Sequence, residues 1–305
     1  MLDEIEKNNL FELNTVHGIF PANADGDDIV VYEPSEAFTA ELAEKSKLNF
    51  ESSDVDNQKN NTVKSNCCGS HNHGGCGCHS VGTKASESVA NGCKEVSVYT
   101  KANLKEMVRF NTLRRQDEIK GEKHVAIADY IAPKEAGIPD YLGAFTVAVL
   151  GADELAKKFE NEGDNYKAIL VKVLADRFAE ALAERLHELV RNDYWGYSKK
   201  EELTNEQLLK AEYVGIRPAI GYPSIPDHSE KLKLQKLLNF ERIGVSLTES
   251  YMMKPVSSVC GLYFAHSQAK YFDVGRIYEE QLLDYSKRKQ MTKEELRKIM
   301  PNRIV

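Results

Sequence analysis

Apolar residues recur at helical spacing between Tyr166 and Trp195, and this is the clearest pattern in the chain. The apolar positions are Val171, Leu174, Phe178, Leu182, Leu186 and Leu189. Residues three and four apart share one face of a helix, so the spacing predicts one long helix with a single buried face. Asp164 stands where its N-cap is expected. Shorter helices are predicted after Thr204, Asp227 and Thr292, each followed three residues later by Glu or Gln, the capping-box pattern.

Runs of apolar and β-branched residues predict strands elsewhere. The predicted strands are residues 29–33, 124–132, 143–151 and 256–266. Gly261 is a candidate bulge in the last of them. A short N-terminal helix is expected from the spacing of Leu2, Ile5, Leu10 and Leu13. Pro21 and Gly26 indicate a loop before residue 29. Because helices and strands are mixed without regular βαβ alternation, the fold class expected is α+β, a central antiparallel twisted sheet flanked by helices.

One stretch breaks these patterns. Residues from about 50 to 66 are polar and offer almost nothing to bury, so they are expected to be disordered. The chain is therefore divided into a first folded part at 1–34, a low-complexity insertion at 35–107 and a second folded part at 108–305. The two folded parts are expected to form one domain.

The insertion contains a tract of thiol and imidazole side chains. Its residues are Cys67, Cys68, His71, His73, Cys76, Cys78 and His79. Such ligands suit zinc or another soft metal, such as copper(I) or nickel. The tract lacks the paired C-x-x-C knuckles of a zinc finger, and its glycines favour a flexible binder. A metal-binding tract and a non-functional insertion both remain open.

Composition narrows the function classes. The 305 residues carry a net charge of -7 and no basic block interleaved with aromatic residues, which argues against a nucleic-acid partner. No segment reaches the ~18 consecutive apolar residues of a membrane span. The acidic N-terminus lacks the features of a secretory signal, so a cytoplasmic location is expected.

Residues 215–231, GIRPAIGYPSIPDHSEK, form the segment with the most specific chemistry. Three prolines and two glycines within twelve residues fix an irregular, rigid backbone. Arg217 supplies a planar fork that suits a carboxylate, Tyr222 supplies a ring and a hydroxyl, and Gly221 lets a ligand approach the main chain. These features suit a small zwitterionic ligand. The pattern alone, however, favours a rigid loop whose arginine pairs with a local acid.

The run from Arg217 to Pro223 resembles the signature of the activation domain of cobalamin-dependent methionine synthases. Further blocks resemble the same family in the expected order, and together they cover roughly residues 1–34 and 108–300. These blocks are residues 18–33, 128–145, 171–197, 246–255 and 261–272.

The resemblance implies a domain that binds S-adenosylmethionine and closes over a cobalamin module. The methyl group is then donated after reductive repair of oxidised cobalamin. The resemblance assigns the ligand carboxylate to Arg217, and it places the backbone near Ala219 and Gly221, with Tyr222, around the ligand. Tyr271 and Phe272 match an aromatic pair at the ligand, where a ring face attracts a sulfonium cation.

The resemblance also implies partners. Asp176, Glu180 and His187 share one stripe of the long helix, opposite its apolar face, and such a stripe is ordinarily a solvated surface. The resemblance matches Asp176 and Glu180 to positions that face the cobalamin module. A flavodoxin-type protein is the expected electron donor. The lower-ligand motif of the cobalamin module, Asp-x-His-x-x-Gly, is absent, and so are the homocysteine and folate modules. The family domain is also expected to begin before Met1, with an acidic residue that contacts the ligand's amino group.

The leading hypothesis is thus an S-adenosylmethionine-binding reactivation module of the synthase, a 5-methyltetrahydrofolate–homocysteine methyltransferase. The module supports reductive methylation of cobalamin in methionine biosynthesis without a complete active site of its own. The alternative is a metal-binding or corrinoid-handling accessory protein that uses the Cys/His tract. A truncated product without activity is a third reading.

Overall fold

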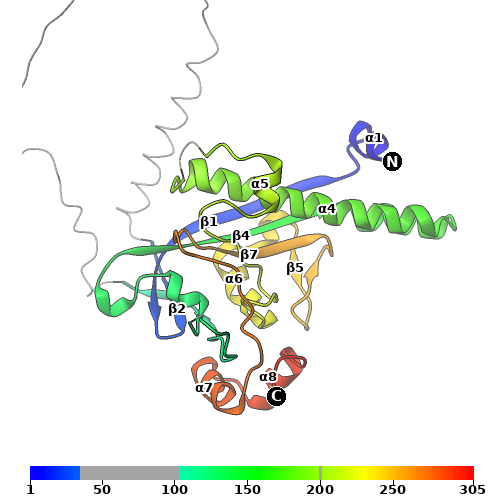
Figure 1. Cartoon of the computed structure of the whole chain (residues 1–305). Coiled ribbons are helices and arrows are strands. Elements are labelled where there is room, and N and C mark those ends of the chain that lie inside the picture. Colours follow the sequence, from blue (N-terminus) through cyan, green and yellow to red (C-terminus); the bar gives the residue numbers. More distant parts are fainter. Residues whose placement is uncertain (35–103, 122, 199–200) are drawn as a thin grey trace, which may run out of the picture. The chain divides into compact units, whose positions relative to one another are not determined.

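An antiparallel five-stranded sheet, in the order β3-β2-β1-β4-β7, organises the computed structural model (Figure 1). The structure describes residues 1–34, 104–121, 123–198 and 201–305. The strands are β1 (Glu12–Asp25), β2 (Asp28–Tyr32), β3 (Glu106–Asn111), β4 (Asp140–Leu150) and β7 (Ser258–Tyr263). With the helices around it, this sheet confirms the α+β class.

Strands β2 and β3 come from parts of the chain that are far apart in the sequence. They pair antiparallel, with Ile29 opposite Phe110, so residues before 35 and after 103 build one sheet. Strand β3 begins at Glu106, within the last two residues of the stretch expected as an insertion. The Cys/His tract, residues 67–79, lies outside the described residues.

Strand β1 replaces most of the loop expected before residue 29, and of that loop only the turn at Gly26 is present. The expected N-terminal helix ends at Lys7, so Leu10 and Leu13 lie outside it. The strand runs from Glu12 to Asp25 and pairs with β4 from Glu12 to Ala22. Pro21 suggested a turn because proline cannot donate to a sheet ladder. It lies just outside the β1–β2 register, however, which starts at Ala22. Proline is therefore tolerated inside this long strand.

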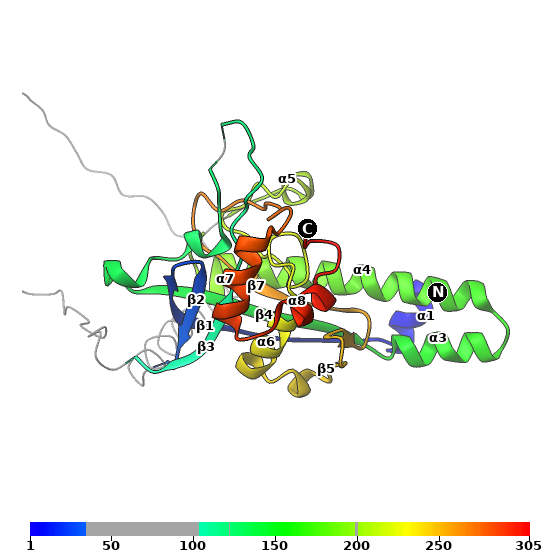
Figure 2. The same ribbon diagram turned by 90° about the horizontal axis from the view of Figure 1, so that it is seen from below.

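Strand β4 is buried on both faces, as a continuous apolar run predicts. Leu142, Ala144 and Ala148 face a core that includes α6, whereas Phe145 and Val147 face α4. Successive side chains of β4 point to opposite faces of the sheet, so the strand packs against a layer on each side. One layer is the helical pair α3 (Ala152–Asn161) and α4 (Asn165–Leu189), which Figure 2 shows side by side. The other contains α6 (Lys231–Leu238).

Helix α4 confirms the long helix predicted from the apolar spacing. Asp164 caps it by accepting a hydrogen bond from the Lys167 amide at 3.0 Å. Its most buried face is centred on alanines, beside the predicted leucine stripe; the buried residues are Ala168, Val171, Ala175, Ala179, Ala183, Leu186 and His187. Small side chains let a helix lie close to its neighbours. His187 is fully buried, so its expected place on a solvated stripe was wrong.

Residues 124–132 do not form the strand predicted there. The segment instead contains a 3-10 turn at Ile127–Tyr130. The Asp129 carboxylate accepts a hydrogen bond from the Ala126 amide at 3.0 Å and pairs with Arg114. Such a local bond from a side chain competes with a sheet ladder for the backbone. The apolar residues of the segment are still buried, which explains its strand-like composition.

Two of the three predicted capping boxes are present. Thr204 and Thr292 form capping boxes at α5 (Asn205–Leu209) and α8 (Lys293–Ile299). Asp227 instead caps a 3-10 turn, His228–Glu230, through the Ser229 amide. Helix α8 packs against α7 (Glu279–Lys289) around a separate core that includes Leu282 and Leu296.

The remaining elements are short. They are α1 (Leu2–Lys7), β5 (Ser246–Leu247), β6 (Met253–Lys254), a π-helical turn at Val190–Tyr194, and 3-10 turns at Lys134–Ala136 and Phe240–Ile243. Among the described residues, no helix has the length and apolar character needed to cross a membrane.

Candidate functional site

The segment 216–220 runs along the outer edge of β7 as an irregular extra strand. Ile216 and Phe264 exchange two backbone hydrogen bonds of 3.0 Å, and the Leu262 amide donates to the Pro218 carbonyl at 3.1 Å. Proline lacks an N–H, so the pairing cannot continue as a regular ladder. The sheet edge therefore fixes the backbone of Arg217 while its side chain leaves the sheet.

Two glycines make this close approach feasible. A Cβ at Gly261 would lie 2.4 Å from the Pro218 carbonyl oxygen, so the glycine admits the neighbouring backbone. The β4–β7 register is continuous through Gly261, and the expected bulge is absent there. Gly221 has a φ of 97°, and a Cβ there would meet the His228 ring at 2.4 Å. Gly221 thus serves the backbone turn and its packing on His228.

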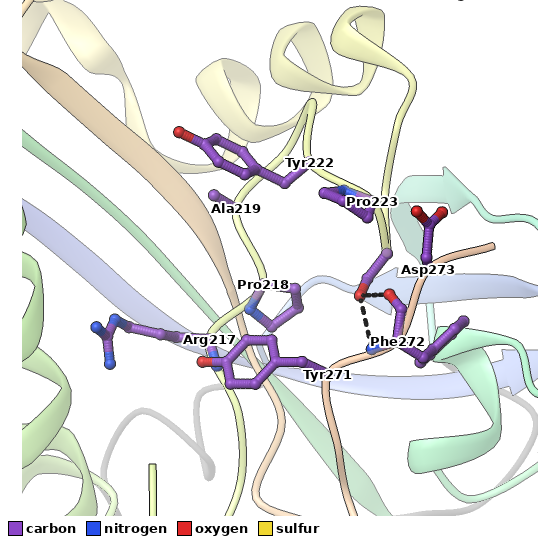
Figure 3. A pocket seen from close by; sticks show the side chains of 9 residues that line it. Arg217, Pro218, Ala219, Tyr222, Pro223, Tyr271, Phe272 and Asp273 are labelled. Carbon is purple, nitrogen blue, oxygen red and sulfur yellow. Dashed lines mark hydrogen bonds between the residues drawn. The ribbon is translucent and has the colours of Figure 1, made fainter. Parts of the chain in front are cut away.

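A cavity of about 540 Å³ opens beside this segment. Its lining residues are Arg217, Pro218, Ala219, Tyr222, Pro223, Ser224, Tyr271, Phe272 and Asp273 (Figure 3). The volume lies within the roughly 300–1,000 Å³ usual for small-molecule sites. The cavity brings together all the residues expected around the ligand except Gly221.

Hydrogen bonds hold the two segments that form the cavity. The Ser224 hydroxyl donates to the Phe272 carbonyl, and the Val274 amide donates to the Pro223 carbonyl at 3.1 Å. At the other end the Arg217 amide donates to the Tyr271 hydroxyl at 3.0 Å. Tyr222 remains 66% exposed, so its ring is free to contact a ligand.

The Arg217 guanidinium points away from Pro223 and Asp273 and toward α4 (Figure 3). Nη2 pairs with Glu184, and Nη1 donates to the Tyr213 hydroxyl at 2.9 Å and approaches His187 Nδ1 at 3.4 Å. Both possibilities left open by the sequence are therefore present together, because Arg217 lines the cavity and also pairs with an acid. Nε donates to no described residue and remains available.

Protonation states in this cluster follow from burial and charge. Burial lowers the pKa of His187 well below its ordinary value, and Arg191 and Arg217 lower it further, so the ring is neutral. With Nδ1 facing a guanidinium donor, the proton belongs on Nε2, which donates to the Tyr197 hydroxyl at 3.2 Å. Burial also lowers the pKa of Arg217, but attraction to Tyr213 and Glu184 outweighs it and raises the pKa overall.

Asp176 and Glu180 do not line the cavity. Both are exposed on α4; Asp176 accepts a hydrogen bond from the Ser257 hydroxyl at 2.7 Å, and Glu180 pairs with Arg177 at 2.7 Å. Within the described ranges, no group of three or more His, Cys, Asp or Glu side chains is arranged to hold a metal ion. The seven candidate metal ligands fall outside those ranges.

Sequence reasoning missed several residues of the site. Ser224 and Asp273 line the cavity, and each lies within two residues of a residue that the sequence assigned to the ligand. Glu184 and Tyr213 contact the Arg217 side chain from α4 and from the segment before Arg217. Glu184 carried a usable signal, because it lies one helical turn after Glu180 and three residues before His187.

An α+β domain whose sheet edge presents an arginine and aromatic rings to an open cavity belongs to the class of small-molecule-binding modules. A family model described as "Vitamin B12 dependent methionine synthase, activation domain" matches residues 79–290. A solved structure described as "Crystal Structure of the MetH Reactivation Domain bound to AdoHcy" matches with a TM-score of 0.75 and 34% identity. That match covers 100% of this chain and 74% of the other. The chain belongs to the family of vitamin B12-dependent methionine synthase activation domains.

This membership confirms the resemblance drawn from Arg217 to Pro223 and the function class inferred from it. The comparisons lend no support to the alternative of a metal-binding accessory protein, nor to zinc as a cofactor.

Proposed function

We propose that the cavity beside Arg217 binds S-adenosylmethionine and its demethylated product, S-adenosylhomocysteine (AdoHcy). The observation that carries the proposal is the lining itself, which combines Arg217 with the rings of Tyr222, Tyr271 and Phe272. The similar MetH reactivation domain, solved bound to AdoHcy, supports the same ligand class.

The chemistry of the lining fits this ligand. The unused Nε–H of Arg217 can donate to an α-carboxylate, and such charge-assisted bonds are stronger than neutral ones. The exposed rings of Tyr222 and Tyr271 offer faces to a sulfonium cation, an attraction of about 0.5–2 kcal/mol. Ala219 and Pro223 also line the same cavity.

The proposed role is methyl donation during reductive reactivation. The sulfonium methyl group leaves as the equivalent of a methyl cation and AdoHcy remains. A cobalamin held by a partner module of the synthase would supply the cobalt that accepts the methyl group, and a flavodoxin-type protein would supply the electron that reduces it. The residues of this chain bind and orient the donor and keep its sulfonium against aromatic surface.

Helix α4 is the proposed docking face for the cobalamin module. Asp176 and Glu180 are exposed on it, and family membership supports a partner of this kind. Glu180 is proposed to contact the histidine released from cobalt. The chain is proposed to contribute one domain, built from residues 1–34 and 108–305, around the intervening stretch.

Calorimetric titration of the chain with AdoHcy and with S-adenosylmethionine tests the proposal. We expect one ligand per chain, and loss of binding on Tyr271→Ala, because this change removes both a ring face and the partner of the Arg217 amide. Tyr166→Ala, a change of an exposed tyrosine on α4 away from the cavity, is the matched control. If neither ligand binds, with or without a cobalamin module, the proposed function is wrong.

A further inference from the structure

Strand β1 has one long edge that is only partly covered. On one side it pairs with β4 from Glu12 to Ala22, but on the other side β2 pairs with it only from Ala22 to Asp25. Figure 1 shows β2 beside one end of β1. Within the described ranges, no backbone hydrogen bond reaches residues 12–20 from that side. The N–H and C=O groups that point away from β4 there have no strand partner among these residues.

Burial along β1 changes where β2 ends. The residues from Pro21 to Ala24 are buried, whereas those from Glu12 to Phe20 are exposed or only partly buried. Leu13 is 46% exposed at the start of the strand. An unpaired strand edge of this length, with apolar side chains beside it, is a template for pairing with another strand.

The usual protections of a sheet edge are missing from this stretch of sequence. From Leu13 to Phe20 it reads LNTVHGIF, without Lys, Arg, Asp, Glu or Pro, the residues that normally discourage pairing at an edge. Thr, Val, Ile and Phe are instead enriched in strands. The outer strands of the sheet differ, because the segment 216–220 runs along β7 and β3 carries Glu106 and Arg109.

We propose that this edge of β1 is a dimerisation surface, which pairs antiparallel with the same edge of a second copy of the chain. A two-fold axis near Val16 places residues 12–20 of the two copies side by side. Leu13 of one copy then lies opposite Ile19 of the other, and no two like charges face each other. The pairing stops before Ala22, where β2 already occupies the edge.

A second copy is the occupant that the side chains of this edge fit. Main-chain hydrogen bonds can be made with any extended segment, so the side chains decide which strand is added. This edge is uncharged between its ends and carries Leu13 near one end and Ile19 near the other, so it is complementary to itself. A two-fold contact of this kind is closed, because each copy uses up the edge that it offers.

Sedimentation equilibrium of the wild type and three variants tests the inference, at about 1–100 µM to bracket a dissociation constant in the micromolar range. Leu13→Lys and Thr15→Lys each place an ammonium group on the edge, and both positions are exposed, so the core is not disturbed. Leu209→Lys is the matched control, since it makes the same change at a leucine of α5 that is 89% exposed. Urea unfolding of each variant shows whether it is folded.

We expect the wild type to be a dimer at the highest concentration and to dissociate on dilution. Leu13→Lys and Thr15→Lys should each raise the dissociation constant at least tenfold, because a lysine on an edge opposes pairing. Leu209→Lys should leave the constant within twofold.

A wild type that is monomeric throughout overturns the inference, and so does a dimer that neither edge variant weakens. If the wild type is monomeric and Leu13→Lys weakens its association with a cobalamin module, the edge belongs to that partner instead of a second copy. None of these outcomes bears on the cavity, so the proposed function is tested separately by the AdoHcy titration.

Discussion

Two ionic clusters in the described part of the chain are built from similar groups and differ in how completely their polar atoms are paired. The core cluster consists of Asp227, Glu230, Lys233, Tyr285 and Lys289. Each of its carboxylate oxygens has a donor: Lys289 bridges Asp227 at 2.7 Å and also reaches Glu230, and the Tyr285 hydroxyl donates to Asp227 at 2.8 Å. The cluster joins β3, α6 and α7.

The site cluster consists of Glu184, His187, Arg191, Tyr213, Arg217 and Tyr263. Several of its buried atoms have no hydrogen-bond partner among the described residues: Glu184 Oε1, both Nη atoms of Arg191 and the Tyr263 hydroxyl. Unsatisfied buried polar groups are rare in native proteins and call for a reason. Complete pairing is expected of a cluster that holds the fold, whereas unpaired polar atoms beside a cavity leave groups available to a ligand.

Lys289→Met gives the largest effect that this comparison predicts. The change leaves Asp227 and Glu230 buried without their shared cation, and breaking such a pair costs about 3–5 kcal/mol. The free energy of unfolding, measured with urea, should fall by that amount. AdoHcy affinity of the folded protein should stay the same.

Lys287→Met is the control, because Lys287 is exposed on the same helix. It should change the free energy of unfolding by less than about 0.5 kcal/mol. A loss below about 1 kcal/mol for Lys289→Met would show that the core cluster does not hold the fold.

Arg217→Met should give the opposite result. It removes the proposed carboxylate contact, and a hydrogen bond to a charged group contributes about 1.5–3 kcal/mol, so AdoHcy affinity should fall roughly tenfold to more than a hundredfold. Stability should change by only about 1 kcal/mol, because the remaining Glu184 side chain reaches solvent. Titration and urea unfolding of the same variant separate the two effects. A large loss of stability with unchanged affinity would make this cluster structural.

The two clusters should also respond to acid in different pH ranges. Burial lowers the pKa of His187, so as pH falls below about 6.5 the unfolded chain binds a proton that the folded chain does not. Stability is then lost on acidification, by at most about 1.4 kcal/mol per pH unit. His17 and His228, whose pKa values burial also lowers, add to the same slope.

His187→Phe should therefore flatten the fall in stability between pH 6.5 and 5.5. In the core cluster, burial alone would raise the pKa of Asp227, but Lys289 outweighs it and lowers the pKa. The stability from Asp227 is present above about pH 3.9 and is lost as pH falls through the lower folded value. Urea unfolding at half-unit pH steps measures both ranges. A slope that His187→Phe leaves unchanged would contradict the buried neutral histidine.

Much of the fold follows from local patterns in the sequence. The spacing from Val171 to Leu189 located α4, and Asp164 marked its start, because helical period and capping are local properties. The strand predicted at residues 124–132 was wrong because the Asp129 side chain, which pairs with Arg114, bonds to the backbone in place of a neighbouring strand. The length of β1 was not predicted, because Pro21 fits inside the strand only in this strand register, and the sequence does not reveal the register.

In the candidate site, too, local features could be predicted from the sequence and long-range contacts could not. Rigidity around Arg217, Tyr222 and Gly221 could be inferred, since prolines and glycines act on their own backbone. The partner of Arg217 could not be inferred, because Glu184 is 33 residues away and reaches it only after α4 packs beside the sheet edge. The same limit hid the burial of His187, which looked like one more polar residue of a solvated helix face.

Glu180→Gln is the smallest perturbation, and it tests a charge that belongs to neither cluster. Glu180 is exposed, and Arg177 is its one ionic partner in the part of the chain that the structure describes. Surface pairs of this kind contribute about 0–0.5 kcal/mol, so unfolding and AdoHcy affinity should hardly change. If α4 docks on a cobalamin module, the loss of this carboxylate should weaken that association severalfold. Titration of the chain with a cobalamin module measures it, with Glu160→Gln on α3, whose partner is Lys172, as the control. Equal association for both variants would remove Glu180 from the docking face. Reduced association with unchanged AdoHcy binding would place Glu180 in docking and not in ligand binding.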